Sequence, residues 1–422
     1  MEKAYLVGVC IDDDPHFEHA LQELKGLAGA CGFEVVGEMT QNLPAAHNAL
    51  YIGTGKLAQL RQEIALVQPD MLIFDNALSP TQLRNLQQEL DMPILDRTSL
   101  ILEIFSSRAR TKEAKLQVEL ARLQYTLPRL VGLHAALGRQ GGASGAMSNK
   151  GAGEKKLELD RRYIEHRINE CRRSLKDVAK DRDTQRKLRN SSALPQVALV
   201  GYTNAGKSTV MNSLLTYFDQ DEDRKVLEQD MLFATLDTTV RRIMPADHRG
   251  FFLSDTVGFI DRLPHHLVQA FRSTLEEAVT ADLLLQVVDF SDPAYKEHIQ
   301  VTTQTLDELG AGDIPMLTLY NKVDLAENAP ETPAVTDRAF YFSAKNPDHI
   351  QSLLAFICDH LYQKQVLADF LFPYTEGGRV SYLQENADVR SQEYLPEGIR
   401  VTASCTKEIA ERLRNWMQSC CH

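Results

Sequence analysis

The chain has 422 residues, of which 43% are hydrophobic and 25% are charged, so it is long enough for two or three domains of ordinary globular composition. Its net charge of −12 by itself argues against a protein that coats nucleic acid. No apolar run reaches the length of a membrane span, and the N-terminus does not look like a signal peptide, so we expect neither an integral membrane protein nor a secreted one.

Residues 1–105 alternate between short apolar runs and helix-compatible stretches. Strands are expected at 5–10, 33–36, 71–74 and 94–95, and helices are expected after the first and the third of these strands. This order predicts a small α/β domain with a mostly parallel sheet. Gly53-Thr54-Gly55-Lys56 resembles half a phosphate-binding loop, but Leu57 stands where a magnesium-binding hydroxyl is needed. We therefore interpret it as a turn that caps a helix.

Residues 106–190 are predicted to form a helical hairpin. Leucines at 116, 120, 123 and 127 fall on one face of a helix over 109–130, and Pro128 predicts that this helix is near its end. Residues 138–153 are rich in glycine and too poor in apolar side chains to pack, so we expect a flexible tip. A second helix over 154–188 then returns beside the first. An inert linker is the alternative interpretation of the tip.

The charge of the hairpin opposes that of the rest of the chain. Residues 108–189 hold 21 Lys and Arg against 10 Asp and Glu, a balance of +11, which leaves −23 on the remainder. Such asymmetry indicates a polyanion-binding segment on an otherwise acidic protein. A solvated pair of helices with a basic bias is the plainer alternative.

Residues 191–365 are predicted to form a nucleotide-binding domain. A buried strand at 197–200 leads into Gly201-x-x-x-x-Gly206-Lys207-Ser208, and a helix-compatible stretch follows. This strand, loop and helix form the context that a phosphate-binding loop requires. The glycines let backbone N–H groups surround a phosphate, Lys207 reaches the β- and γ-phosphates, and the Ser208 hydroxyl binds Mg²⁺.

Four further motifs follow in order, at or near expected strand ends. Phe233 to Thr239 contains threonines that are candidates to sense the γ-phosphate through Mg²⁺. Asp255-Thr256-Val257-Gly258 follows a strand, so Asp255 is expected to support Mg²⁺ and the Gly258 N–H to bind the γ-phosphate. Asn321-Lys322-Val323-Asp324 and Ser343-Ala344-Lys345 come next, and the Asp324 carboxylate can accept hydrogen bonds from guanine N1–H and N2–H. Together they predict a guanine-nucleotide domain.

The expected catalytic residues are Lys207, Thr235 and Gly258, and the expected Mg²⁺ ligands are Ser208 and Thr235. The residues expected to contact the nucleotide are Gly201, Tyr202, Thr203, Asn204, Ala205, Gly206, Lys207, Ser208, Phe233, Ala234, Thr235, Leu236, Asp237, Asp255, Thr256, Val257, Gly258, Asn321, Lys322, Val323, Asp324, Ser343, Ala344 and Lys345. Residues 366–422 are predicted to form a small α+β module whose chemistry the sequence does not reveal.

Longer blocks resemble the HflX family of the Obg–HflX superfamily. They are 201–209, 232–237 and 255–260 in the nucleotide domain, and Asp96-Arg97-Thr98, 101–105, 113–121 and 128–130 before it. The resemblance covers residues 1 to about 365. Two departures lie in the tip, where the family's Arg-Gly-Pro-Gly-Glu is here Lys150-Gly151-Ala152-Gly153-Glu154. Lys lacks the planar fork of Arg, and Ala152 removes a rigid proline.

The resemblance implies a P-loop GTPase domain, with a mostly parallel sheet and helices on both faces, after an α/β domain and a hairpin. It implies a cytoplasmic GTPase that binds the large ribosomal subunit and splits stalled ribosomes, with the hairpin tip reaching toward the peptidyl-transferase centre. It also favours Thr235 over Thr239 as the Mg²⁺ ligand, through similarity to Obg proteins. Asn204 resembles a K⁺-binding asparagine of related GTPases, or else it only shapes the loop.

From this we expect GTP and GDP as substrate and product, Mg²⁺ as cofactor and K⁺ as a further candidate. The expected partner is 23S rRNA of the large subunit, bound through residues 108–189 by a monomer that binds no DNA. Phe259 stands where signalling GTPases place a water-orienting glutamine, so we expect slow turnover without a partner. A 50S assembly GTPase and an RNA-binding regulator with structural nucleotide remain alternatives.

Overall fold

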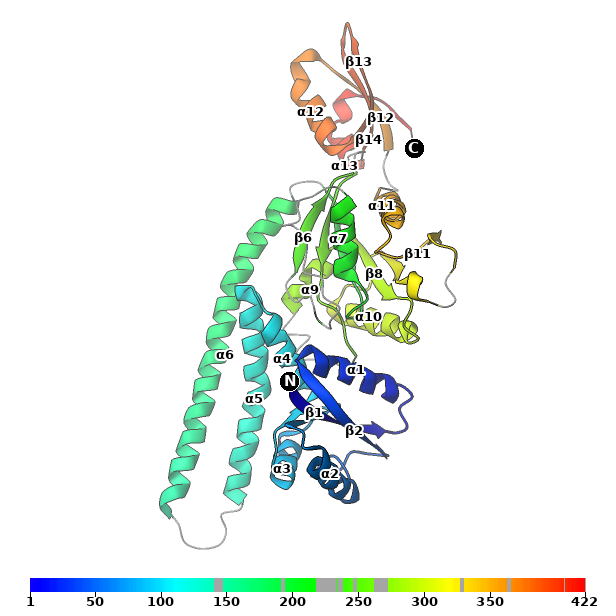
Figure 1. The fold of residues 1–422 in the computed structure, drawn as a ribbon. Helices are drawn as coiled ribbons and strands as arrows, with labels where there is room; N and C mark the ends of the chain where they lie inside the picture. Colours follow the sequence, from blue (N-terminus) through cyan, green and yellow to red (C-terminus); the bar gives the residue numbers. More distant parts are fainter. Residues whose placement is uncertain are drawn as a thin grey trace. The chain divides into compact units, whose positions relative to one another are not determined.

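The computed structural model describes residues 1–139, 147–190, 194–217, 233, 238–245, 249–261, 272–326, 330–362, 366–405 and 407–421. Two compact units emerge, and each is described by itself. The first comprises Met1–Arg182, Gln229–Asp237 and Ile260–Ser273, and the second comprises Asp183–Glu228, Thr238–Phe259 and Thr274–His422. Figure 1 shows the elements of both.

A parallel sheet of order β2-β1-β3-β4 forms the centre of the N-terminal unit. The side chains of Tyr5, Val7 and Val9 alternate along β1 and pack in one core with helices α2 and α3, while α1 covers the opposite side at Gly8. The elements are β1 (Glu2–Ile11), α1 (Phe17–Ala30), β2 (Phe33–Leu43), α2 (Thr54–Val67), β3 (Met71–Phe74), α3 (Pro80–Leu90), β4 (Ile94–Asp96) and α4 (Arg97–Arg108). The expected order of strands and helices is confirmed, and Gly53 is the N-cap of α2.

Two long helices, α5 (Lys112–Arg139) and α6 (Met147–Asn190), run side by side (Figure 1). Leu120 packs against Ile168 and Cys171 between them, with Leu116, Leu123, Leu127, Ile164 and Leu175 around this core. Arg167 adds an ion pair to Glu119 across the pair of helices. The leucine stripe predicted from the sequence is therefore the contact face of the hairpin.

Two boundaries of the hairpin differ from expectation. Helix α5 continues eleven residues past Pro128, although proline lacks the N–H that a helix interior needs. Arg129, the next residue, is anchored on the preceding turn, since its Nη1 donates to the Tyr125 carbonyl at 3.0 Å and its guanidinium lies over the Tyr125 ring. Helix α6 begins at Met147, so residues 147–153 of the expected glycine-rich tip are helical, while 140–146 lie outside the described residues.

A mixed sheet of order β10-β11-β9-β8-β5-β7-β6 carries the nucleotide domain, and all its pairings are parallel except those of the two edge strands. Helices α7 and α11 pack on one face in a single core with Leu199, Leu319 and Phe340, and α10 contacts β8. The elements are β5 (Gln196–Val200), α7 (Lys207–Tyr217), β6 (Thr239–Ile243), β7 (Phe251–Asp255), α9 (Arg272–Val279), β8 (Leu283–Asp289), α10 (Tyr295–Leu309), β9 (Met316–Asn321), η2 (Val323–Leu325), β10 (Ala334–Val335), β11 (Ala339–Tyr341) and α11 (Pro347–Leu361).

The C-terminal residues form an antiparallel sheet of order β13-β14-β12-β15 with two helices, as the α+β prediction requires. Phe370, Phe372 and Val401 lie in its core beside Leu383 and Leu413. The elements are β12 (Val366–Phe372), η3 (Tyr374–Glu376), α12 (Gly377–Asn386), β13 (Asp388–Leu395), β14 (Gly398–Cys405), α13 (Lys407–Arg412), η4 (Arg414–Trp416) and β15 (Met417–Cys421).

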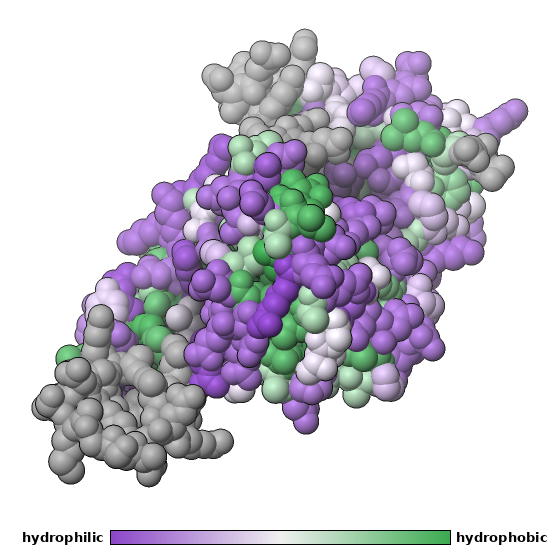
Figure 2. All heavy atoms as spheres, turned by 60° about the horizontal axis from the view of Figure 1, so that its bottom comes forward, coloured by the Kyte–Doolittle hydropathy of each residue, from purple (hydrophilic) through white to green (hydrophobic). Residues whose placement is uncertain are grey.

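Hydrophilic side chains occupy most of the face drawn in Figure 2, with apolar groups of limited extent among them. Among the helices that the structure describes, none has both the length and the apolar composition needed to cross a bilayer.

Candidate functional site

The phosphate-binding loop lies between β5 and α7, as predicted, and its two glycines have positive φ angles of 143° at Gly201 and 96° at Gly206. A Cβ at Gly201 would collide with the Val287 carbonyl, and one at Gly206 would collide with the Asn321 side chain. Asn204 also has a positive φ, 59°, which asparagine tolerates better than most residues. This geometry accounts for Asn204 as a loop-shaping residue, and its K⁺ role stays a prediction.

Lys207 is the first residue of α7 and is buried. Its Nζ donates to the carbonyls of Gly201 at 3.1 Å and Tyr202 at 2.8 Å, which places the amino group inside the loop. Burial lowers the pKa of Lys207 to about 8, and the Asp255 carboxylate opposes that shift in part. An anion bound in the loop would raise the pKa of Lys207 again and favour its charged form.

Nucleotide binding is therefore expected to take up protons above pH 8. The lowered pKa of about 8 means that Lys207 loses its proton as pH rises through that value, whereas the phosphate-bound form keeps it. GDP affinity should fall with rising pH above 8, by up to about tenfold per pH unit. Calorimetry at about pH 8.5 in buffers of different ionisation enthalpy measures the uptake. Equal proton uptake at about pH 7 and pH 8.5 would contradict the prediction.

Two oxygen ligands suited to Mg²⁺ meet at the start of α7. The Ser208 hydroxyl donates to the Asp255 carboxylate at 2.6 Å, and Asp255 is fully buried at the end of β7. Hydroxyl and carboxylate oxygens are the ligands that Mg²⁺ prefers, so these residues fit that ion. The third predicted member, Thr235, lies outside the described residues together with Ala234, Leu236 and Asp237.

The segment that begins at Gly258 is attached to the phosphate loop by backbone hydrogen bonds. The Thr203 N–H donates to the Phe259 carbonyl at 2.8 Å, and the Phe259 N–H donates to the Gly201 carbonyl at 3.1 Å. Thr256 and Val257 are buried, and the Thr256 hydroxyl donates to the Leu199 carbonyl inside the sheet. Gly258 is therefore held beside the loop, where its N–H can serve a γ-phosphate.

Replacing Gly258 by alanine is expected to reduce GTP hydrolysis by about 100-fold, the usual cost of losing one donor to developing charge. The added Cβ would lie 2.8 Å from Thr203 Cα and 3.0 Å from Lys207 Nζ, so the segment must move away. GDP affinity should change less, because GDP lacks the γ-phosphate. Single-turnover hydrolysis and GDP titration measure both effects. Gly55→Ala, where the added Cβ meets nothing, is the matched control, and equal rates in the two variants would refute the prediction.

Asn321 links the phosphate loop to the second base-binding motif. Its Nδ2 donates to the Ala205 carbonyl at 3.0 Å, and its Oδ1 accepts from the Ala344 N–H at 2.9 Å. The Ser343 N–H donates to Nδ1 of the buried His349 at 3.0 Å. The Asn321 side chain therefore joins the two loops by hydrogen bonds. Lys345, which follows Ala344 in the chain, is exposed.

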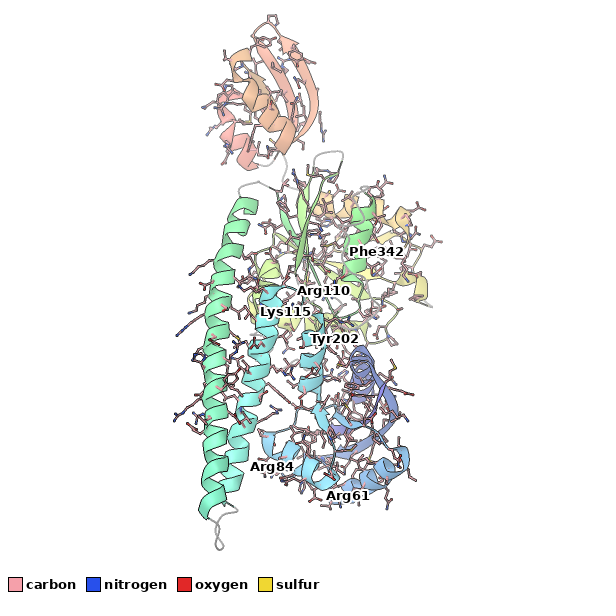
Figure 3. All side chains as sticks on the ribbon, turned by 60° about the vertical axis from the view of Figure 1, so that its left-hand side comes forward. Arg61, Arg84, Arg110, Lys115, Tyr202 and Phe342 are labelled. Carbon is pink, nitrogen blue, oxygen red and sulfur yellow. The ribbon has the colours of Figure 1, made fainter. Side chains whose placement is uncertain are left out.

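Lys322 and Asp324 occupy different environments within one motif. Lys322 has a positive φ of 61° and its Nζ forms an ion pair with Asp289 at 2.7 Å, at the end of the neighbouring strand β8. Val323 is buried, whereas Asp324 is exposed in η2, where its carboxylate is available to a base. Figure 3 shows Tyr202 and Phe342 in this domain.

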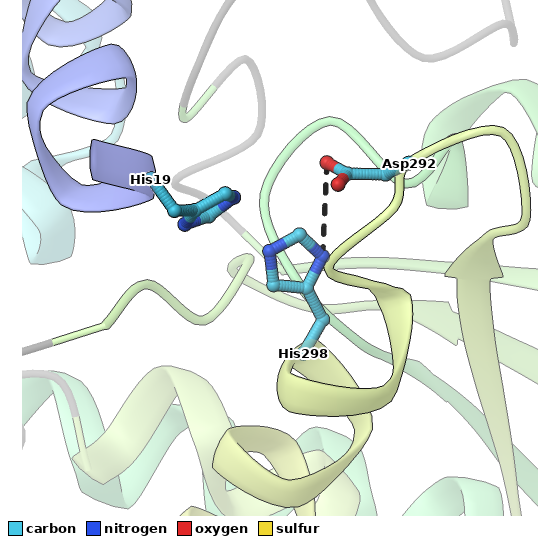
Figure 4. A group of neighbouring side chains, drawn as sticks. All are labelled: His19, Asp292 and His298. Carbon is cyan, nitrogen blue, oxygen red and sulfur yellow. Dashed lines mark ion pairs between the residues drawn. The ribbon is translucent and has the colours of Figure 1, made fainter. Parts of the chain in front are cut away.

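Sequence reasoning missed three side chains that shape these loops: Asp289, His298 and His349. His298 of α10 stacks on Tyr202 with ring centroids 3.9 Å apart. Its Nδ1 lies 4.0 Å from an Asp292 carboxylate oxygen (Figure 4). None of the three belongs to a recognisable motif. Asp289 offered one signal, since it ends a strand beside the motif strand. Phe233, predicted to contact nucleotide, is buried and packs edge-on against Phe105 of α4, with centroids 4.6 Å apart.

Family models match three consecutive parts of the chain. They are described as the GTP-binding GTPase N-terminal region (18–106), the GTP-binding GTPase middle region (108–189) and a 50S ribosome-binding GTPase (196–322). The GTPase HflX of Caldanaerobacter subterraneus subsp. tengcongensis is 45% identical over 418 residues, which cover 99% of this chain and 94% of the relative. The chain belongs to the GTPase HflX family. It is accordingly a GTP-hydrolysing enzyme, and the predicted family and fold class are confirmed.

A second relative matches nearly the whole chain. The GTPase HflX of Lacrimispora saccharolytica is 40% identical over 409 residues, covering 97% of this chain and 94% of the relative. A crystal structure of a GTP-binding protein from Sulfolobus solfataricus in complex with GDP matches at 25% identity with a TM-score of 0.43, covering 86% of this chain and 98% of that one.

Proposed function

We propose that this HflX-family GTPase binds the large ribosomal subunit through its helical hairpin and separates stalled ribosomes in a nucleotide-dependent way. The observation that carries the proposal is a basic hairpin on an acidic chain that also contains a GTPase domain. The description of the family model over 196–322, a 50S ribosome-binding GTPase, supports the same partner. In this proposal the protein is a cytoplasmic monomer that contacts 23S rRNA and does not bind DNA.

The described part of the hairpin offers cations that are available to phosphates. Arg172, Arg173 and Lys176 are exposed on α6, and among the residues that the structure describes none forms an ion pair with them. Residues three and four apart share one helix face, so the three charges lie together. Arg161 and Arg162, about three turns earlier, are instead paired with Glu165 and Glu158. Unpaired cations bind a phosphate backbone without first breaking an internal ion pair.

Hydrolysis needs positioning and charge neutralisation more than covalent chemistry. Lys207 and the N–H of Gly258 would hold the β- and γ-phosphates, and Ser208, Asp255 and Thr235 would hold Mg²⁺, which neutralises charge on the phosphates when bound. Asp324 would select guanine. Phe259 is buried at the position after Gly258 and cannot orient water by hydrogen bonding. We therefore expect slow turnover alone and faster turnover when large subunits are added.

The hairpin is tested by co-sedimentation with large subunits. Binding should be tighter with a non-hydrolysable GTP analogue than with GDP. The variant Arg172→Ala/Arg173→Ala/Lys176→Ala is expected to weaken binding about tenfold or more and to lower the salt dependence by about three ion equivalents. Arg161→Ala/Arg162→Ala, on the same helix, should change affinity less than threefold, because these cations are already neutralised. Equal effects of the two variants would contradict binding through this face.

The splitting role is separated from its alternatives by sucrose gradients of mature 70S ribosomes with the protein and GTP. Dissociation into subunits supports splitting. Binding to immature subunits without dissociation of 70S particles would instead support an assembly GTPase. Normal action by Lys207→Ala would support an RNA-binding regulator in which nucleotide is structural.

A further inference from the structure

The chain leaves the phosphate loop immediately after Phe259 and joins the N-terminal unit. Phe259 is held by two backbone hydrogen bonds to the loop, whereas Ile260 and Asp261 belong with Met1–Arg182. Ile260 is buried. The short stretch from Gly258 to Asp261 therefore has one end on the nucleotide loop and the other in the N-terminal unit, and Asp261 comes only three positions after Gly258 in the chain.

Arg97, the first residue of α4, holds the far end of that stretch. Its Nη2 donates to the Asp261 carbonyl at 3.3 Å. The same guanidinium forms ion pairs with Asp75, at 2.7 Å, and with Glu23, and all three side chains are buried. Only the planar fork of arginine serves several acceptors in fixed directions at once, and the two carboxylates fix its orientation.

Asp96, the preceding residue, forms hydrogen bonds to helix α5 of the hairpin. Its carboxylate is the N-cap of α4 and accepts from the Ser99 N–H at 2.9 Å. It also accepts from the Tyr125 hydroxyl and from Arg129 Nη2, the latter at 3.1 Å, and both of these residues lie on α5. Asp96 is 1% exposed, so this polar network is shielded from water and sensitive to its geometry.

Helix α4 also contacts the second segment expected to sense nucleotide. Phe105, two turns after Arg97, packs edge-on against Phe233, the first residue of the segment 233–239 that is expected to sense the γ-phosphate. Both rings are nearly fully buried. One helix thus contacts Phe233 of that segment and Asp261, three residues after Gly258, and its first turn is joined to the hairpin.

We propose that Arg97 is a positioning residue for GTP hydrolysis and that the adjacent pair Asp96 and Arg97 couples the segment after Gly258 to the hairpin. Arg97 holds the Asp261 carbonyl, which keeps the Gly258 N–H directed at the γ-phosphate. A shift of Asp261 on loss of that phosphate moves Arg97 and the first turn of α4, and Asp96 passes the shift to Tyr125 and Arg129. The coupling to the hairpin rests on the proposed function, and the positioning role rests only on the GTPase activity.

The positioning role is tested in the full chain by steady-state kinetics and GDP titration. Arg97→Lys keeps the charge beside Glu23 and Asp75 but loses the fork, so kcat should fall threefold to tenfold, by rough estimate, while GDP affinity stays within about twofold. Arg61→Lys, at an exposed arginine of the same unit whose partner is Glu89, touches neither Arg97 nor Asp261 and should keep kcat. An unchanged or raised kcat in Arg97→Lys, or parallel losses of kcat and GDP affinity in both variants, overturns the proposal.

A second pair of variants covers the case in which Arg97→Lys fails to fold. Asp261→Gly frees the backbone that carries the acceptor carbonyl, and Asp261→Ala removes the same side chain but keeps the backbone restricted. Only the glycine variant should lower kcat. Equal kcat values in these two variants overturn the positioning role.

The coupling is tested by amide hydrogen exchange around residues 122–129 with GDP and with a non-hydrolysable GTP analogue. Protection there should differ between the two nucleotides in the wild type, and the difference should shrink at least threefold in Arg97→Lys. No nucleotide dependence in the wild type, or an undiminished one in the variant, overturns the coupling. That outcome leaves ribosome binding untouched, because co-sedimentation tests it separately.

Discussion

Lys207→Ala is expected to weaken GDP and GTP binding by roughly 100-fold or more, since charge-assisted hydrogen bonds to two phosphates are lost and each is worth about 1.5–3 kcal/mol. The ammonium is buried inside the loop, where its Nζ donates to the carbonyls of Gly201 and Tyr202. Titration with a fluorescent guanine nucleotide measures the loss, and single-turnover hydrolysis should fall at least as far.

The fold of this variant should survive, which makes the loss interpretable. Burial lowers the pKa of Lys207 to about 8, so below that pH the buried charge destabilises the folded state. Removing it therefore offsets the stability lost with the two hydrogen bonds. The matched control is Lys56→Ala, in the partial motif Gly53-Thr54-Gly55-Lys56, which the structure places at the start of α2. Equal nucleotide affinity in the two variants would refute the role of Lys207. Weaker nucleotide binding by Lys56→Ala would instead indicate that the partial motif at 53–56 binds nucleotide.

Asp324→Asn is expected to reduce GDP affinity by about 100-fold or more and to improve affinity for the xanthine nucleotide, which lowers discrimination between the two bases. The carboxylate accepts from guanine N1–H and N2–H, whereas an amide presents one donor to that edge and meets the xanthine carbonyl instead. Asp324 is exposed in η2, so the substitution should not disturb packing.

Competition between GDP and XDP for a fluorescent nucleotide gives both affinities in one assay. Asp313→Asn, an exposed aspartate in the turn before β9, is the matched control and should bind GDP as the wild type does. Retained guanine preference in Asp324→Asn would mean that base selection lies elsewhere, for example in the backbone N–H groups near Ala344.

Pro128 and the glycine-rich run predict an end of helix that the structure does not show at 128 or at 147–153. Pro128 lies inside α5, and the helix is held at that point by tertiary contacts, since Arg129 is bound by Asp96, 33 residues earlier. Residues 147–153 begin α6 despite their glycines. Helix propensity is a weak local preference, and the pairing of two long helices overrides it.

The sequence by itself determined the phosphate loop, the Asp255 and Asp324 motifs and the leucine stripe of the hairpin, because each depends on residues close together in the chain whose spacing follows from strand or helix geometry. Only the tertiary structure decided that Asn321 bridges to Ala205, that Asp289 holds Lys322 and that Arg97 reaches Asp261. These contacts join residues 33 to 164 positions apart. No local periodicity encodes such pairs, since packing alone brings them within hydrogen-bond distance.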